Sequence, residues 1–225
     1  MGLLTPILDL FFPPRCVFCR GFLQKGQRNI CPPCMETLPF CEGEEACVEG
    51  EDFSVCVSPF YYVDTVRESH HRYKFQGASF YAKAYAPFVA RCVTEHCAGQ
   101  FDLISWVPLS RRRLRKRGYD QAKLLAQGTA KALGIEAAAT LKKVKNTAAQ
   151  SGIGGKDARQ TNISGAYQVP DRARVAGQRI LLIDDIATTG ATLSECARAL
   201  HAAGAKEVLC ATLARAEEKG IAGDS

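Results

Sequence analysis

The chain has 225 residues, of which 47% are hydrophobic and 23% charged, and its formal net charge is +6. This composition is typical of a globular protein and excludes a disordered or collagen-like chain. The length suits one α/β domain with a small additional module. No apolar run approaches the ~20 residues that a membrane-spanning helix needs.

The charge is distributed unevenly along the chain. Residues 1–60 contain four Lys/Arg and eight Asp/Glu, a net charge of −4, whereas residues 61–225 contain twenty-five and fifteen, a net charge of +10. The contrast predicts two parts with different roles. The basic part suits an anionic partner, either a phosphorylated small molecule or a nucleic acid.

The first twelve residues, MGLLTPILDLFF, are apolar, but no basic residue precedes the apolar run, which is interrupted by Pro6 and Asp9. A secretory signal differs in both respects. The sequence therefore predicts a cytoplasmic protein.

Seven of the eleven cysteines lie before residue 57, and four of them form two C-x2-C pairs separated by eleven residues, Cys16/Cys19 and Cys31/Cys34. Two such pairs can close a tetrahedron of thiolates around Zn²⁺. Because four cysteines leave no open coordination position, the predicted zinc is structural. Free cytosolic thiols are the alternative, but four exposed thiols would be open to oxidation.

The remaining cysteines have looser spacing. Cys41, Cys47 and Cys56 form either a degenerate second metal knuckle or, as we favour, small buried side chains. Residues predicted to lie in the core are Cys92, Cys97, Cys196 and Cys210. A short N-terminal module buries little apolar surface, so a metal would supply folding energy. We expect a zinc-binding module over residues 1–55, with its boundary in the acidic stretch 42–52, and a second domain over residues 56–225.

Beyond residue 55, strand patterns alternate with helix patterns. Strands are expected at 56–63, 101–107, 179–186 and 207–214, and helices at 79–97, 119–134 and 191–204. This alternation predicts βαβ units that form a parallel sheet with helices on both faces.

The strand at 179–186 ends in two adjacent acids, Asp184 and Asp185, and a turn of small residues follows. Backbone amides and hydroxyl groups of that turn can surround a phosphate at a helix N-terminus. The turn residues are Ala187, Thr188, Thr189, Gly190, Ala191 and Thr192. The two carboxylates suit the hydroxyl groups of a sugar, or Mg²⁺. Together they predict a phosphorylated-ribose site, with an Asp-rich strand end before a Thr-capped helix as the alternative.

This segment is neither a Walker loop nor a Rossmann fingerprint; it resembles the phosphoribosyl pyrophosphate (PRPP) loop of type I phosphoribosyltransferases. Three further segments, in order, resemble those of the ComF family: Tyr73-Lys74-Phe75-Gln76-Gly77; Val107-Pro108-Leu109-Ser110 followed by Arg117-Gly118-Tyr119-Asp120-Gln121; and Gln150, Arg159 and Asn162 before Gly165-Ala166-Tyr167. With the four cysteines, the resemblance covers residues 7 to about 215. Tyr119 and Asp120 replace the family's usual Phe and Asn, and the family's second cysteine pair is loosened to Cys41 and Cys47.

The resemblance implies a type I phosphoribosyltransferase-like α/β domain, preceded by a four-cysteine zinc-ribbon-like module. It also implies that the loop Pro108–Arg113, with Mg²⁺, binds pyrophosphate. The implied anion-binding residues are Ser110, Arg111, Arg112, Arg113, Arg117 and Arg159. Residues 111–117 carry six positive charges in seven positions, for which a solvated basic loop is the alternative. Lys156–Asn162 would belong to a flap fixed by Gln150 and Asn162.

Other polar residues carry weaker signals. Lys74 is either a site residue or a surface lysine. Trp106, at the end of an expected strand, is interpreted as a packing residue. The four histidines, His70, His71, His96 and His201, are interpreted as surface or core residues.

The first functional hypothesis is a PRPP-dependent enzyme in which Asp184 and Asp185 form the catalytic pair; no residue identifies the acceptor. ComF relatives are associated with natural competence and DNA uptake. The second hypothesis is therefore a non-catalytic or regulatory protein that handles single-stranded DNA through residues 111–117, with the zinc module docking a helicase-like partner. A third is an accessory role in sugar-acid utilisation. The oligomeric state cannot be predicted.

Overall fold

The computed structural model describes residues 13–145 and 164–217. The helices are α2 (Pro32–Thr37), α3 (Asp64–Phe75), α4 (Ala82–Cys97), α5 (Arg111–Arg117), α6 (Gln121–Leu133) and α8 (Ala191–Ala202), with 3-10 turns at Gly43–Ala46 and Ser79–Tyr81. The strands are β1 (Cys47–Val48), β2 (Cys56–Val57), β3 (Phe60–Tyr61), β4 (Leu103–Trp106), β5 (Lys142–Lys143), β6 (Tyr167–Gln168), β7 (Arg179–Ala187) and β8 (Glu207–Arg215). None of the helices in these ranges is long and apolar enough to cross a membrane.

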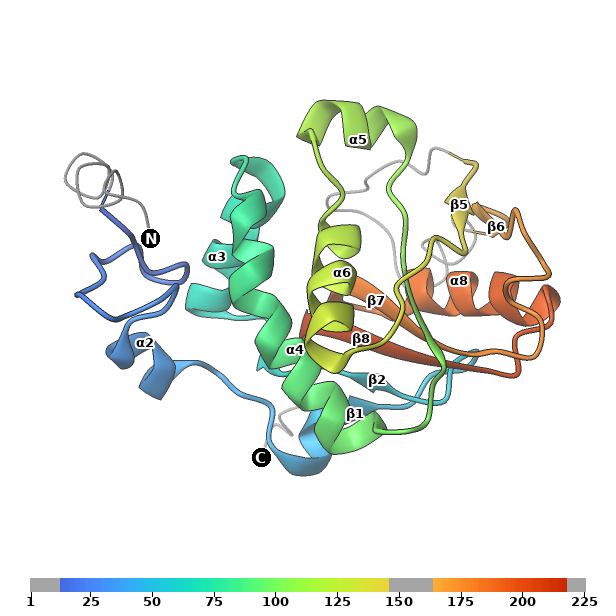
Figure 1. The fold of residues 1–225 in the computed structure, drawn as a ribbon, viewed down its shortest axis with the longest axis horizontal. Helices are drawn as coiled ribbons and strands as arrows, with labels where there is room; N and C mark the ends of the chain where they lie inside the picture. Colours follow the sequence, from blue (N-terminus) through green and yellow to red (C-terminus); the bar gives the residue numbers. More distant parts are fainter. Residues whose placement is uncertain (1–12, 146–163, 218–225) are drawn as a thin grey trace, which may run out of the picture.

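The main sheet has the strand order β1-β2-β8-β7-β4, and β3 also pairs with β8 (Figure 1). Every pairing within it is parallel except that of β1 with β2. The predicted parallel sheet is thus confirmed, with one short antiparallel strand at its edge. The strand expected at 56–63 is divided into β2 and β3 around Ser58–Pro59, because proline cannot donate a hydrogen bond to a ladder.

Alternating side chains of β7 form two hydrophobic cores, one on each face of the sheet. Leu181 and Ile183 pack in the core that contains α4 and α6, whereas Ile180 and Leu182 pack in the core that contains α8. Burial on both faces explains why this strand is a continuous apolar run. The acids at its carboxyl end therefore follow directly on a segment that is buried in both cores.

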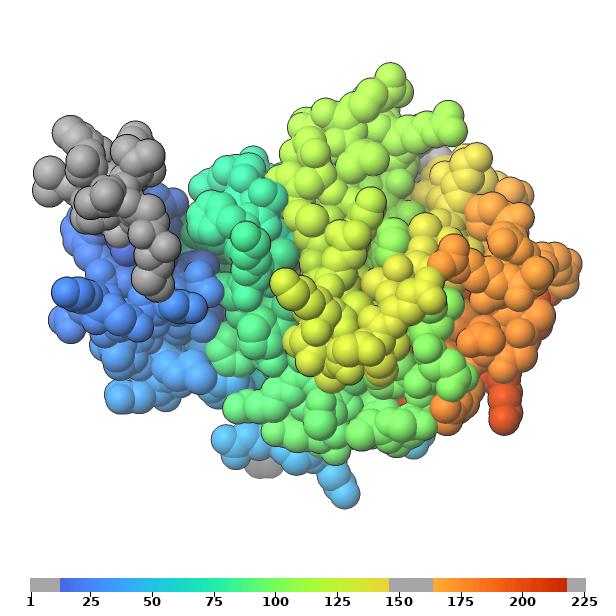
Figure 2. Space-filling view, in the orientation of Figure 1, coloured from blue at the N-terminus to red at the C-terminus, as the bar shows by residue number. Residues whose placement is uncertain are grey.

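The N-terminal module is packed against the α/β domain. Cys16, Val17 and Phe18 are buried in the same core as α4, and the Phe18 ring lies 5.9 Å from the rings of both Phe60 and Tyr85. The space-filling view shows the N-terminal segment, in blue, next to α3, in teal (Figure 2). The chain then enters the main sheet at β1, inside the acidic stretch where we expect the domain boundary.

Helix α3 has no counterpart among the expected elements. Its buried residues are Val66, Ser69, His70 and Tyr73, so half of its inward-facing side chains are strongly polar. A helix with this composition lacks the apolar stripe from which amphipathic helices are predicted. Its partners lie on the cysteine module and β7, and also on α4 and α6, where Ser69 meets the Tyr85 hydroxyl and the Tyr73 hydroxyl donates to the Gln121 carbonyl.

Candidate phosphate-binding pocket

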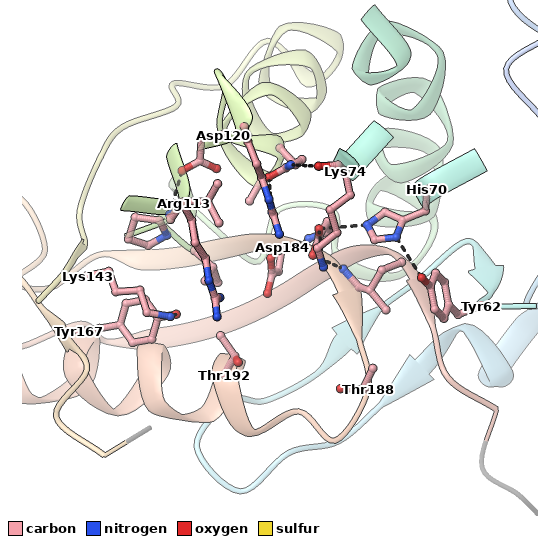
Figure 3. A pocket seen from close by; sticks show the side chains of 18 residues that line it. Tyr62, His70, Lys74, Arg113, Asp120, Lys143, Tyr167, Asp184, Thr188 and Thr192 are labelled. Atoms are coloured by element: carbon pink, nitrogen blue, oxygen red, sulfur yellow. Dashed lines mark hydrogen bonds and ion pairs between the residues drawn. The ribbon is translucent and has the colours of Figure 1, made fainter. Parts of the chain in front are cut away.

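An open cavity of about 260 Å³ lies at the carboxyl ends of β4 and β7 (Figure 3). This is the edge of a parallel α/β sheet where ligands bind. The polar residues that line the cavity are Tyr62, His70, Lys74, Arg113, Arg117, Asp120, Gln121, Lys143, Tyr167, Asp184, Asp185, Thr188 and Thr192. The sequence-predicted acids, two of the turn threonines and two arginines of the basic run thus meet in one pocket.

The two acids at the end of β7 have different partners. One oxygen of Asp185, Oδ2, lies 3.0 Å from His70 Nε2 and 3.6 Å from Lys74 Nζ, and the other accepts the Ile186 amide at 3.0 Å. Asp184 Oδ1 accepts the Asp185 amide at 2.8 Å. Asp185 is therefore held by the protein on both oxygens, while Asp184 receives a backbone hydrogen bond on one.

These partners separate the pKa values of the two carboxyls. Burial and the adjacent charge of Asp185 raise the pKa of Asp184 well above its ordinary value. Burial acts in the same direction on Asp185, but Lys74, His70 and Arg117 together hold the pKa of that carboxyl far below its ordinary value. Asp185 is thus ionised at neutral pH, and protonation is favoured at Asp184.

The turn after β7 ends in a glycine that leads into α8. Gly190 adopts a left-handed φ of 72° as the residue before α8, a conformation in which a residue with a Cβ is strained. Gly190 supplies no side-chain cap to α8, and the Ala191 amide donates to Thr189 Oγ1 at 3.5 Å. Thr188 and Thr192 line the cavity. Ala187, Thr189, Gly190 and Ala191 build the turn without lining the cavity.

The basic run forms helix α5, which begins within the segment Pro108–Arg113 that the family resemblance leads us to expect as a loop, and the alternative of a solvated basic loop over residues 111–117 does not hold. Ser110 caps the helix by accepting the Arg113 amide at 3.4 Å, and Gly118, with φ 82°, ends it in the left-handed conformation. Arginine, leucine and lysine all favour helix in between. Ser110 itself is buried in this capping role and does not line the cavity.

The helical period divides the six cations between two faces of α5. Arg113 and Arg117, one turn apart, are half-buried and line the cavity. The exposed cations, which do not line it, are Arg111, Arg112, Arg115 and Lys116. Arg117 donates to Gln121 Oε1 at 3.0 Å and lies 5.2 Å from the centre of the Phe75 ring.

Asp120, an acid where the family resemblance leads us to expect Asn, has a structural role at the pocket wall. Its Oδ1 accepts the Lys123 amide at 3.1 Å and caps α6, and its Oδ2 accepts the Leu109 amide at 2.9 Å. One side chain thereby fixes both the start of α6 and the loop that follows β4. Burial raises the pKa of Asp120 above its ordinary value.

Sequence reasoning missed part of this pocket. His70, interpreted as a surface or core residue, is 1% exposed and contacts Asp185, and Lys74, which contacts the same carboxylate, lines the cavity. Lys143 donates to the Tyr167 hydroxyl at 2.9 Å, and both line the cavity. The four-residue spacing of His70 and Lys74 would have placed them on one helix face, had α3 been expected.

Other expectations are met. Trp106 and the late cysteines, Cys92, Cys97, Cys196 and Cys210, are buried. His71 and His201 are exposed, and His96 is half-buried. Gln150, Arg159 and Asn162, with the rest of the expected flap, lie outside the described residues.

The four early cysteines fit a zinc ion. The Sγ atoms of Cys16, Cys19, Cys31 and Cys34 all lie within 4.8 Å of one another. The amide of Gly21 points to Cys19 Sγ at 3.3 Å and that of Cys31 to Cys16 Sγ at 3.5 Å, the donors that thiolate ligands accept. Burial alone would raise the pKa of Cys16, but backbone donors, led by the Cys31 amide, lower it to about 7. The donor set of four thiolates is that of a structural zinc site.

Within residues 13–145 and 164–217, this is the one group of three or more Cys, His, Asp or Glu side chains that could hold a metal. Cys41 and Cys56 are buried, and Cys47 is half-buried. The interpretation of these three as packed side chains, rather than a second knuckle, agrees with their placement.

Comparison with known proteins gives two domain matches. The double zinc ribbon domain matches residues 7–53, and the phosphoribosyl transferase domain matches residues 121–224. The second match contains the acids and the turn after β7. The type I phosphoribosyltransferase-like fold and the zinc-binding module expected from the sequence are both confirmed.

Three relatives show the wider family. Competence protein F of Haemophilus influenzae is 30% identical over 227 aligned residues, which cover 92% of this chain and 99% of that protein. Competence protein ComFC of Streptococcus pneumoniae is 29% identical over 203 residues, 89% of this chain and 87% of its own. DNA utilization protein YhgH of Salmonella typhi is 36% identical over 117 residues, 50% of each chain. With a relative at this identity matched over nearly its whole length, this chain belongs to the competence protein F family.

Proposed function

We propose that this protein binds phosphoribosyl pyrophosphate, or a closely related ribose phosphate, together with Mg²⁺ in the pocket at the ends of β4 and β7. The observation that supports this best is the meeting of three features in one cavity: the start of α8, the acids of β7 and the inner face of α5. A cavity of about 260 Å³ is close to the lower end, ~300 Å³, of the range for small-molecule sites.

The phosphate, ribose and pyrophosphate groups of the ligand would each meet residues of suitable charge and hydrogen-bonding capacity. The 5′-phosphate accepts amide hydrogens of residues 187–192 and lies at the positive end of the α8 dipole. The ribose hydroxyl groups donate to the carboxylates of β7. The pyrophosphate meets Arg113 and Arg117, whose side chains enter the cavity from α5.

Magnesium fits this arrangement as a companion of the ligand. Mg²⁺ keeps several waters and typically takes one or two carboxylates plus substrate phosphates. Asp184 supplies such a carboxylate, because Asp185 is already bound to Lys74 and His70 on the oxygen that faces them. Bound Mg²⁺ would neutralise charge on the pyrophosphate.

If the protein catalyses phosphoribosyl transfer, its own residues stabilise the charges that develop during the reaction. Departure of pyrophosphate from C1′ leaves positive charge on the ribose ring. The ionised carboxylate of Asp185 stabilises that charge, and Arg113 and Arg117 stabilise the negative charge on the departing group. Asp184 and Asp185 are thus the residues proposed for catalysis, and the acceptor is left open.

Calorimetric titration of zinc-loaded protein with PRPP and Mg²⁺ tests the site. We expect saturable binding that is lost in the Asp184→Asn/Asp185→Asn double variant. Glu95→Gln, an exposed acid-to-amide change on α4, is the matched control and should bind as wild type. Absence of binding by folded wild-type protein, or binding retained by the double variant, would contradict the proposal.

A second candidate function rests on the outer face of α5. Its four exposed cations, Arg111, Arg112, Arg115 and Lys116, form a surface suited to a nucleic-acid backbone. The names of the relatives, competence and DNA utilization proteins, agree with a role in DNA handling. In this version the zinc module would dock a helicase-like partner.

The two surfaces can be separated by mutation. Replacing the four exposed cations by Ala should weaken binding of single-stranded DNA and flatten its salt dependence, by about 0.7 in log–log slope for each phosphate that is no longer neutralised. PRPP binding should persist in that variant. Replacing Arg113 and Arg117 by Ala should have the opposite pattern. If both variants weakened the binding of single-stranded DNA equally, the two faces of α5 would not have separate roles.

A further inference from the structure

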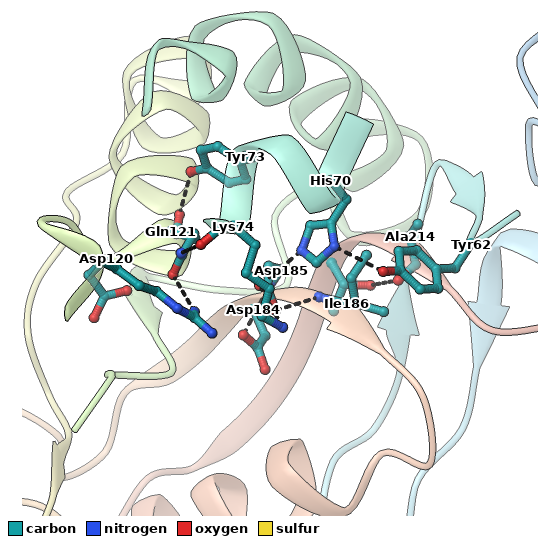
Figure 4. Close-up of polar contacts among 12 residues, drawn as sticks. Tyr62, His70, Tyr73, Lys74, Asp120, Gln121, Asp184, Asp185, Ile186 and Ala214 are labelled. Atoms are coloured by element: carbon teal, nitrogen blue, oxygen red, sulfur yellow. Dashed lines mark hydrogen bonds and ion pairs between the residues drawn. The ribbon is translucent and has the colours of Figure 1, made fainter. Parts of the chain in front are cut away.

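Helix α3 lies between the cysteine module and the pocket, and polar side chains link it to both. Toward the pocket, His70 and Lys74 contact Asp185 (Figure 4). Toward the module, Ser69 Oγ donates to the Val17 carbonyl at 2.5 Å. Arg72 donates to that carbonyl at 3.1 Å and also to the carbonyl of Phe18.

Val17 and Phe18 are the two residues inside the first C-x2-C knuckle, between Cys16 and Cys19. Both carbonyl groups accept hydrogen bonds from α3. Ser69 is fully buried and its Oγ also lies 2.5 Å from the Tyr85 hydroxyl, so loss of the Val17 carbonyl would remove one of its two partners. The backbone of the knuckle is therefore hydrogen-bonded directly to the helix that reaches the pocket.

The pocket side of α3 is equally constrained. His70 is almost wholly buried, and its two ring nitrogens have different partners. Because an ionised carboxylate can only accept, Nε2 carries the hydrogen donated to Asp185. Nδ1 then accepts from the Tyr62 hydroxyl at 3.1 Å. Asp185 thus selects the Nε2–H tautomer, and the Tyr62 hydroxyl supports it by donating to Nδ1.

Several elements contribute charged or polar groups around the contact between His70 and Asp185. Asp185 and Asp184 come from β7, Lys74 from α3, Arg117 from α5, and Tyr62 from the segment after β3. Asp185 is thereby fixed on both oxygens, whereas Asp184, with one backbone donor, is available to a ligand. His70 does not need to touch the ligand to influence how it binds.

We propose that His70 is a positioning residue for Asp185 and that α3 transmits the state of the cysteine knuckle to the pocket, so that loss of zinc weakens ligand binding. This inference deepens the proposed function and rests on it for the identity of the ligand. It assigns a role to a buried histidine and makes the zinc module part of the binding machinery.

The residue-level test compares three variants titrated with PRPP and Mg²⁺. Removing the donor in His70→Leu should weaken binding about ten-fold or more. His70→Gln places an amide donor near the Nε2 position and should recover most of the affinity, and Tyr62→Phe should lie in between. If leucine binds as wild type, or if glutamine is as weak as leucine in folded protein, the positioning role is wrong.

The module-level test removes the link without removing the metal ligands. Arg72→Met keeps the aliphatic stem and deletes the donors to the knuckle; Arg67→Met, an exposed arginine on the same helix, is the matched control. With zinc content measured by a chromophoric chelator, we expect weaker PRPP binding by zinc-loaded Arg72→Met and by zinc-free wild type. Unchanged affinity in both would overturn the coupling.

A readout without ligand separates this inference from the proposed function. Long-range ¹H–¹⁵N correlation spectra report the tautomer of His70 in the free protein. We expect the Nε2–H form in zinc-loaded protein and a mixed or altered signal after zinc removal, as in Tyr62→Phe. If wild type fails to bind PRPP, the proposed function fails while this test still decides the coupling; a histidine signal indifferent to zinc would contradict it.

Discussion

Asp184 and Asp185 are neighbours in the chain, yet their side chains lie in opposite electrostatic surroundings. Asp185 has Lys74 and His70 beside it, whereas the charged group that acts most strongly on Asp184 is the carboxylate of Asp185. Environments that drive two carboxyls apart in pKa commonly give them different roles. Asp185 is therefore held in place in its ionised form, whereas Asp184 can change its protonation state and its partners.

The first prediction compares single amide substitutions at pH 7 by thermal unfolding. Asp184→Asn removes a carboxyl whose ionised form is opposed by burial and by the adjacent charge of Asp185, so it should raise the free energy of unfolding, by up to ~1 kcal/mol. Asp185→Asn leaves Lys74 and His70 without an ionised acceptor and should lower the free energy of unfolding by about 1–3 kcal/mol. Shifts of the same sign in both variants would refute the assigned surroundings.

The second prediction is the pH dependence of the Asp184→Asn effect. The pKa of Asp184 is raised above its ordinary value of 3.8 in the folded state, so the group favours folding when protonated and opposes it when pH rises. The gain in Tm from Asp184→Asn should thus be largest near pH 7 and shrink as pH falls toward 4. A Tm difference independent of pH between 4 and 7 would show that the charge is not responsible.

At the scale of elements, α4 and α6 approach closely enough to need a glycine. A Cβ at Gly128 on α6 would lie 2.7 Å from the Ala86 Cβ on α4, a distance that real Cβ atoms do not reach. Both atoms are attached directly to helix backbone, so neither can rotate away. Gly128 therefore sets the spacing of the two helices that cover one face of the sheet.

The third prediction is a double-mutant cycle across this contact, measured by denaturant unfolding. Gly128→Ala should destabilise the protein by about 1–3 kcal/mol, despite the better helix propensity of alanine. Adding Ala86→Gly relieves the clash, so the double variant should be more stable than Gly128→Ala alone. If the losses of unfolding free energy in the two single variants simply added in the double variant, the two positions would not interact, and the proposed clash would be refuted.

At the scale of the whole molecule, the cysteine module and the α/β domain share one core. Cys16, Val17 and Phe18 pack with α4 and with the face of the sheet that carries Leu181 and Ile183. Burial of the knuckle in a common core joins metal binding to the stability of the domain. The module is therefore expected to melt with the domain and not before it.

The fourth prediction follows from this shared core. Chelation of zinc should lower the Tm of the main calorimetric transition instead of removing a separate small one. Cys19→Ser is the control, because Cys19 is the exposed ligand and its replacement disturbs metal binding more than packing. Chelator should have little further effect on that variant. An unchanged main transition in wild type would show that the module folds independently.

Much of this protein was predictable from contiguous residues. The spacing of Cys16, Cys19, Cys31 and Cys34 predicted the metal cluster. Apolar runs predicted β4, β7 and β8, and the small residues after the acids of β7 predicted a tight turn into a helix. These features depend on local rules: side-chain period, the reach of a two-residue turn, and the freedom of glycine at positive φ.

The tertiary structure alone decided which side chains meet. It divided the basic run, bringing Arg113 and Arg117 to the pocket while leaving Arg111 and Arg112 outside it. It also joined His70 to an acid 115 residues further along the chain. Local patterns could not show this, because α3 is buried through polar contacts with distant segments instead of an apolar stripe. The sequence determined which chemical groups each segment carries, and long-range packing determined which of these segments meet in the pocket.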